Sequence, residues 1–173
     1  MGEAKVGEEF ITHEYDEAIA VQQCIVDAET KLAKSHPVAS SRAAINAAMS
    51  EDKDFLTQLK QLGKPHGATG KIEDVAKGLK DLMDETVETA TTEGADSDYY
   101  EAHAVLLNTK RKQMDSAGGM LEIARATDDS KLRTAATAFA KAQKASCQKL
   151  ADELAGFAAT IATAKAPRAS ARA

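Results

Sequence analysis

Glu14, Asp52 and His103 each continue a run of apolar residues at spacings of three and four. Residues at these spacings share one face of a helix, and an apolar face is the one that packs into a core. Carboxylates together with an imidazole suit iron or manganese. Three such groups on three different predicted helices therefore indicate a metal site inside a helical bundle. The alternative is a structural role, in which each carboxylate pairs with Arg42 or a lysine and His103 bonds to a carboxylate or to Tyr99.

Other ionisable residues are expected to lie in solvent. His13, His36 and His66 lie near the start of the chain or in predicted turns, and the run 110–112 (KRK) fits a solvated helix face. Neither a GxSxG sequence nor a phosphate-binding glycine loop occurs, so the residues favour a protein that is not an enzyme. The two cysteines, Cys24 and Cys147, are far apart, as expected for free thiols in a reducing compartment.

The elements that must position these residues are long helices. The apolar pattern predicts five of them, over 9–35, 38–62, 71–92, 96–126 and 130–164. Alanine is abundant and aromatic residues make up only 4% of the 173 residues, which favours closely packed helices. Gly118–Gly119 falls inside the fourth helix, where it would kink the helix, break it or allow a close helix crossing.

Short connections between amphipathic helices are typical of an antiparallel bundle. We therefore expect an all-α, antiparallel four-helix bundle with one additional helix over residues 9–164. A flexible segment over 1–8 and a disordered basic tail over 165–173 complete the predicted organisation.

Charge and hydropathy exclude several partners. The net charge of −5 argues against nucleic-acid binding, and no apolar run approaches the ~20 residues that span a membrane. No targeting segment is recognisable, so a cytoplasmic protein is expected. The remaining partners are a second copy of the chain, in a homodimer formed through an alanine-rich face, and a protein that docks on the C-terminal tail.

Two stretches resemble the bacterial ferritin-like superfamily, in particular its YciE-type stress-associated proteins. The stretch DAETKLAKSHPVASSRAAINAAMSEDKDFLTQLKQLG is similar to the first helical hairpin of that family. The stretch GLKDLMDETVETATTEGADSDYYEAHAVL is similar to its crossover and the start of the next long helix. The likeness covers the architecture of roughly residues 9–157.

The resemblance implies glutamate and histidine ligands for two metal ions. Glu101, in YYEA, matches the fourth-helix glutamate, Glu14 matches helix one, and Asp52 or Asp54 matches helix two. The fifth predicted helix departs from the family, because AKAQKASCQKL has glutamines and a cysteine where an acid or histidine is expected. The candidate metal ligands are therefore Glu14, Asp52, Glu101 and His103.

Three functions remain open at this point. The first is a non-catalytic bundle with a degraded di-metal site that acts in stress response or binding. The second is a functional iron- or manganese-binding bundle that oxidises or stores iron. The third is an adaptor or cargo protein that docks through its tail. Iron or manganese is the expected cofactor only for the second, and no cofactor is expected for the others.

Overall fold

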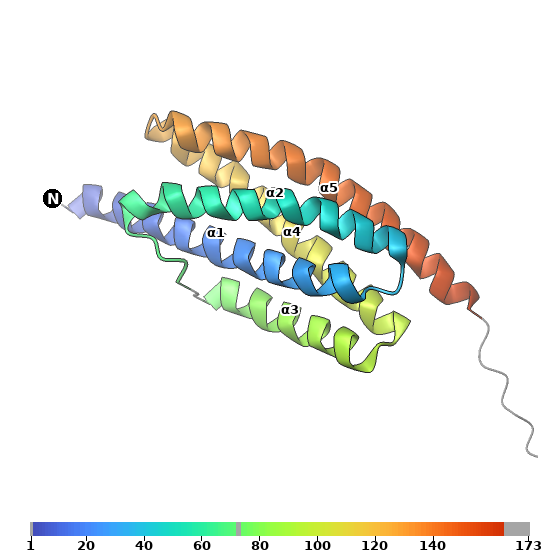
Figure 1. The fold of residues 1–173 in the computed structure, drawn as a ribbon. Helices are drawn as coiled ribbons and strands as arrows, with labels where there is room; N and C mark the ends of the chain where they lie inside the picture. The colour runs from blue at the N-terminus through green and yellow to red at the C-terminus, as the bar shows by residue number, and fades with distance from the viewer. Residues whose placement is uncertain (1, 72–73, 165–173) are drawn as a thin grey trace, which may run out of the picture.

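The computed structural model describes residues 2–71 and 74–164, and almost all of them are helical. The helices are α1 (Gly2–Ser35), α2 (Ala39–Gly63), α3 (Asp74–Glu93), α4 (Asp96–Ala126) and α5 (Ser130–Thr163), with a short 3₁₀ turn, η1 (Lys64–His66). Figure 1 shows how these long helices lie along one another, and successive helices reverse direction.

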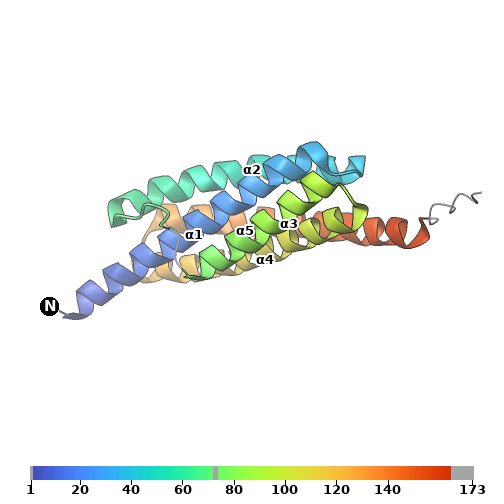
Figure 2. The same ribbon diagram turned by 90° about the horizontal axis from the view of Figure 1, so that it is seen from below.

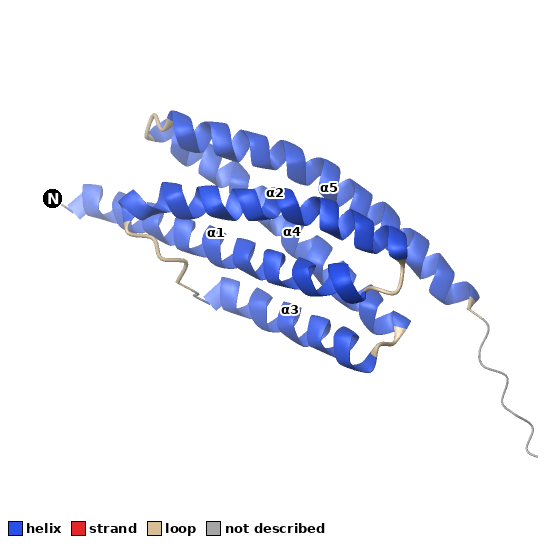
Figure 3. Cartoon of the chain, in the orientation of Figure 1, coloured by secondary structure: helices blue, strands red, loops and turns tan. Residues whose placement is uncertain are grey.

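Four of the helices contact one another in a ring. α1 contacts α2 and α4, and α5 also contacts α2 and α4. α3 packs against α1 and α4. It follows α2 and precedes α4 in the sequence, and it carries the chain back along the molecule (Figure 1). Figure 2, seen from below, shows α3 alongside α1 and α4. Within the described residues no strand is present (Figure 3), so the predicted all-α class is confirmed.

The ends of the helices follow local sequence signals. α1 ends at Ser35 because His36 precedes Pro37, and a residue before proline is pushed out of the helical region. α5 starts after Asp129, whose carboxylate accepts hydrogen bonds from the backbone N–H groups of Lys131 and Leu132, both at 2.9 Å. Such an N-cap satisfies donors that have no partner within the helix.

Two differences from the predicted elements concern helix continuity. α1 begins at Gly2, seven residues before the predicted start, since residues 2–8 contain no proline and several good helix formers. α4 continues through Gly118–Gly119, which are exposed, and a Cβ built on either glycine meets no atom within 4 Å. The glycines therefore neither break α4 nor allow a close helix crossing. The predicted basic tail, 165–173, lies outside the described residues.

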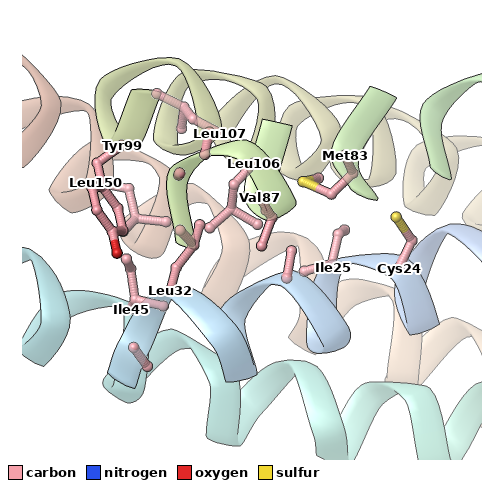
Figure 4. Packing of buried hydrophobic residues seen from close by; sticks show 14 of the residues in the cluster. Cys24, Ile25, Leu32, Ile45, Met83, Val87, Tyr99, Leu106, Leu107 and Leu150 are labelled. Atoms are coloured by element: carbon pink, nitrogen blue, oxygen red, sulfur yellow. The ribbon is translucent and has the colours of Figure 1, made fainter. Parts of the chain in front are cut away.

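The apolar core forms two clusters. The first contains Ile25 and Leu32 of α1 with residues of the other four helices, and Figure 4 shows Leu106 and Val87 directed toward these side chains. The second lies toward the other end and includes Leu59 and the stacked rings of Phe55 and Phe139, whose centroids are 3.5 Å apart. Between the two clusters, α2, α4 and α5 each bury polar side chains: Asp52, Lys110 with Gln113, and Gln143.

Candidate functional site

A layer of five fully buried polar side chains separates the two apolar clusters. We call these residues the polar layer, and each has a relative exposure of 0%: Gln22 and Glu29 of α1, Asp52 of α2, Lys110 of α4 and Gln143 of α5. The four helices of the ring each contribute at least one member. The layer therefore lies at the centre of the ring of helices.

Helical spacing explains why these residues point inward. On α4, buried residues recur at alternating steps of three and four, in the order His103, Leu106, Lys110, Gln113, Ala117. On α1, Gln22 and Glu29 alternate with Ile25 and Leu32 in the same way. Side chains at such steps share one face of the helix. Lys110 shares a helix face with Leu106 and Ala117, so it enters the core when that face is buried.

The Lys110 ammonium joins two carboxylates within the polar layer. Its Nζ donates to Glu29 Oε1 at 2.9 Å and to Asp52 Oδ2. The other oxygen of Asp52, Oδ1, accepts from Gln22 Nε2 at 2.7 Å and from Gln143 Nε2 at 2.6 Å. Asp52 therefore receives donors from three other helices, and both of its carboxylate oxygens are occupied.

The polar layer carries two acids and one base. Burial raises the pKa of Glu29 to about 8, although the nearby Lys110 charge opposes this effect. Burial by itself would lower the pKa of Lys110, but the charges and hydrogen bonds of Glu29 and Asp52 raise it. Glu29 is therefore largely neutral at pH 7, and Lys110 and Asp52 form a compensated ion pair.

Three acceptor atoms of the polar layer have no hydrogen-bond partner among the described residues. They are Gln22 Oε1, Glu29 Oε2 and Gln143 Oε1. A buried acceptor without a donor costs roughly 1–3 kcal/mol. A neutral Glu29 brings one additional O–H donor into this region, which favours the protonated form of its carboxyl group.

The structure gives the four predicted metal ligands different surroundings. Asp52 is in the polar layer, whereas His103 is buried against His36, with ring centroids 5.5 Å apart. Glu14 is half-buried on α1, and Glu101 is exposed on α4, where it borders a surface pocket. Among the described residues, no group of three or more His, Cys, Asp or Glu side chains is placed to hold a metal ion.

Sequence reasoning missed most of the polar layer. The interpretation of Lys110 as part of a solvated face was wrong, and so was the expectation that His36 lies in solvent, because both are fully buried. The alternative role expected for Asp52 was an ion pair with Arg42 or a lysine, and the structure shows this ion pair with Lys110. The available signal was the three-and-four spacing from His103 and Leu106 to Lys110.

Two further observations define the class of protein. Cys24 and Cys147 are free and buried. No helix of the described chain combines the length and apolar character needed to cross a membrane. Together with the helices and the polar layer, these observations describe an all-α protein whose buried centre holds a charged, hydrogen-bonded layer. Comparison of the sequence with protein-family models gives no match, and comparison with curated proteins gives no significant match either.

Proposed function

We propose that the chain is a ferritin-like helical-bundle protein without a catalytic metal centre, and that it acts by binding, in stress response. The observation that carries this proposal is the position of Lys110. Its ammonium contacts one carboxylate from α1 and one from α2 in the buried centre of the helices. In ferritin-like bundles that position belongs to metal ions held by inward carboxylates.

The donor set around Asp52 does not fit a metal ion. A hard cation needs several free oxygen ligands, but Asp52 Oδ1 is bound by two amide groups and Oδ2 by Lys110. The ammonium already supplies the positive charge that compensates the Asp52 carboxylate. A metal ion would have to displace Lys110 into an apolar interior, which is unfavourable for a charged group.

The arrangement of the helices supports the ferritin-like part of the proposal. α1 and α2 form one antiparallel hairpin, α4 and α5 form another, and α3 runs between them as a long connection. Ferritin-like bundles combine two helical hairpins with one long crossover in this manner. The four helices of the ring would then correspond to the bundle, and α3 to the additional helix.

Metal loading tests the proposal. The purified full chain is incubated with Fe(II) without oxygen, and separately with Mn(II), then desalted and analysed for metal. We expect less than stoichiometric metal and no acceleration of Fe(II) oxidation after air is admitted. One metal ion per chain in the wild type, lost in the Glu29→Gln, Asp52→Asn variant, would overturn the proposal in favour of a working metal site. Glu51→Gln is the matched control, because Glu51 is exposed on α2 next to Asp52 and is not a predicted metal ligand.

A second experiment addresses binding. The tail over 165–173 is the sequence-predicted docking segment, and the full chain is compared with a chain that ends at residue 164 in a pulldown from cell extract. If the shortened chain loses the proteins that the full chain captures, while its helical content is unchanged, docking through the tail is supported. Unchanged capture would place the binding surface on the helices instead.

A further inference from the structure

A second buried group of ionisable residues lies at the end of the molecule that holds the α1–α2 turn. His36 belongs to this turn and His103 to α4, and both have a relative exposure of 0%. Their rings meet edge to face, with centroids 5.5 Å apart and planes at 83°. Phe157 of α5 and Tyr99 of α4 lie 4.9 Å and 5.6 Å from the His36 ring. The two imidazoles are therefore part of an aromatic cluster that joins the turn to α4 and α5.

The hydrogen bonds of His36 indicate a neutral ring. Its Nδ1 lies 3.2 Å from the backbone nitrogen of Val38 and accepts that N–H group. An imidazole nitrogen that accepts a hydrogen bond carries no proton, so the proton of the neutral ring is on Nε2. Nε2 is buried and has no partner among the described residues. The ring nitrogens of His103 make no hydrogen bond of normal geometry either, although the Leu150 backbone is close enough to raise the pKa of His103.

The charged groups around the two rings do little to stabilise an imidazolium. From α2, the Arg42 guanidinium donates to the carbonyls of His36 and Pro37, and its positive charge opposes protonation. From α5, Glu153 is the nearby acid, but its carboxylate accepts from the hydroxyls of Ser40 at 2.6 Å and Ser41 at 3.3 Å. Among the described residues that shift the pKa values of His36 and His103 most strongly, none is a charged side chain of α1 or α3.

Burial and charge act in the same direction on both rings. The pKa of His36 is lowered to about 4, mainly by burial and also by the neighbouring His103 and Arg42. Burial also lowers the pKa of His103, although the Leu150 backbone and Glu153 oppose this. A histidine in an open, solvated turn has a pKa near 6.5. The open form therefore takes up protons at a pH at which the closed form does not.

We propose that His36 and His103 form an acid-sensitive latch, which holds the α1–α2 turn against α4 and α5 while both rings are neutral and releases it when they are protonated. Release separates the turn from Tyr99 and Phe157 and exposes their apolar surface. The latch is independent of the polar layer and of the proposed function, because it lies in the first apolar cluster and uses different residues.

Local hydrogen exchange measures the latch directly. The amides of His36 and Arg42 bond to the carbonyls of Leu32 and Val38, so their exchange reports on this turn. The amides of Asp129 and Arg133 report on the α4–α5 turn, which lies at the opposite end of the molecule (Figure 1). Protection factors corrected for intrinsic exchange are compared at pH 8 and pH 5. For His36 alone, the difference between its pKa values in the two forms gives a roughly 30-fold increase in opening.

The variant that removes the latch is His36→Asn with His103→Leu. Asparagine keeps an acceptor for the Val38 N–H, and leucine fills the place of a ring whose nitrogens make no hydrogen bond of normal geometry. We expect the opening of the α1–α2 turn in this variant to be nearly independent of pH, and the α4–α5 turn to stay protected in both proteins. His13→Gln, which removes an exposed histidine of α1, is the control and should behave as the wild type.

Two results would overturn the latch. One is a wild-type α1–α2 turn whose opening does not increase between pH 8 and pH 5, and the other is an equal increase in the double variant. If circular dichroism shows that the double variant does not fold, the wild-type imidazole protons are titrated by NMR. Titration of His36 and His103 near pH 6.5 with the turn still protected contradicts the proposal, whereas titration together with loss of protection supports it.

Discussion

The ammonium of Lys110 lies 2.9 Å from the carboxylate oxygen Oε1 of Glu29, and both side chains are completely buried. Lys110 belongs to α4 and Glu29 to α1, and the two residues are 81 positions apart in sequence. Asp52 of α2 accepts from the same ammonium. The contact therefore fixes the register of three helices, and each change to it has a predictable cost.

Loss of the Lys110 charge should destabilise the fold strongly. In Lys110→Met the buried carboxylate of Asp52 has no cation, and breaking a buried ion pair costs about 3–5 kcal/mol. Urea unfolding followed by circular dichroism measures the change. Lys112→Met on the same helix is the control, because Lys112 and Glu17 are 30% and 24% exposed and their ion pair is worth about 1 kcal/mol or less. Equal costs for the two variants would contradict the importance of the polar layer.

Glu29 should make the protein less stable in alkaline solution. Its pKa is raised to about 8 in the folded state, so the folded chain binds this proton more tightly than the unfolded chain. The contribution is complete below the unfolded pKa near 4.3 and is lost as the pH rises through about 8. Glu29→Gln keeps a neutral group here and should be about 1–3 kcal/mol more stable than the wild type at pH 9. Chemical unfolding at pH 6 and pH 9 tests this, and a variant with the same alkaline loss as the wild type would refute it.

The three acidic residues among the predicted metal ligands should differ sharply in their importance for stability. Asp52→Ala removes the acceptor of the buried Gln143 amide, the shorter of the two hydrogen bonds of Gln22 and the carboxylate that compensates the Lys110 ammonium, and should cost about 3–5 kcal/mol. Glu14→Ala and Glu101→Ala remove half-buried or exposed acids and should change stability by about 0.5 kcal/mol or less. Thermal unfolding with and without chelator provides the measurement. A large, chelator-sensitive effect at Glu14 or Glu101 would support the metal site instead.

The two glycines of α4 offer a stabilising change. Gly118 and Gly119 lie inside a continuous helix, their φ angles are not positive, and a Cβ on either meets no atom within 4 Å. Alanine at each position should stabilise the protein by about 0.5–1 kcal/mol. Gly70→Ala is the contrasting change and should destabilise it, since Gly70 has φ +75° and its Cβ would lie 2.6 Å from Ile19 Cγ2. An increase in melting temperature for the first two variants and a decrease for the third are expected.

The sequence alone determined the helices and most of their buried faces. The apolar spacing predicted the stripe on α2 that contains Ile45, Asp52 and Leu59, and the signal of His36 before Pro37 placed the end of α1 correctly. These features are local, because helical periodicity and proline geometry act within a few residues. On α5 the buried residues Phe139, Gln143 and Cys147 show the same helical periodicity.

Only the tertiary structure decided which polar residues meet. Lys110 stands in a run of three basic residues, and composition assigns such a run to solvent, although its register places it in the core. Its burial depends on two residues from other helices: Asp52 supplies the charge that compensates it, and Glu29 accepts a second hydrogen bond. The energy of a buried charge is set by its partners across the bundle. Spacing along one helix can indicate the face of a side chain, but the packing of all the helices determines its partner.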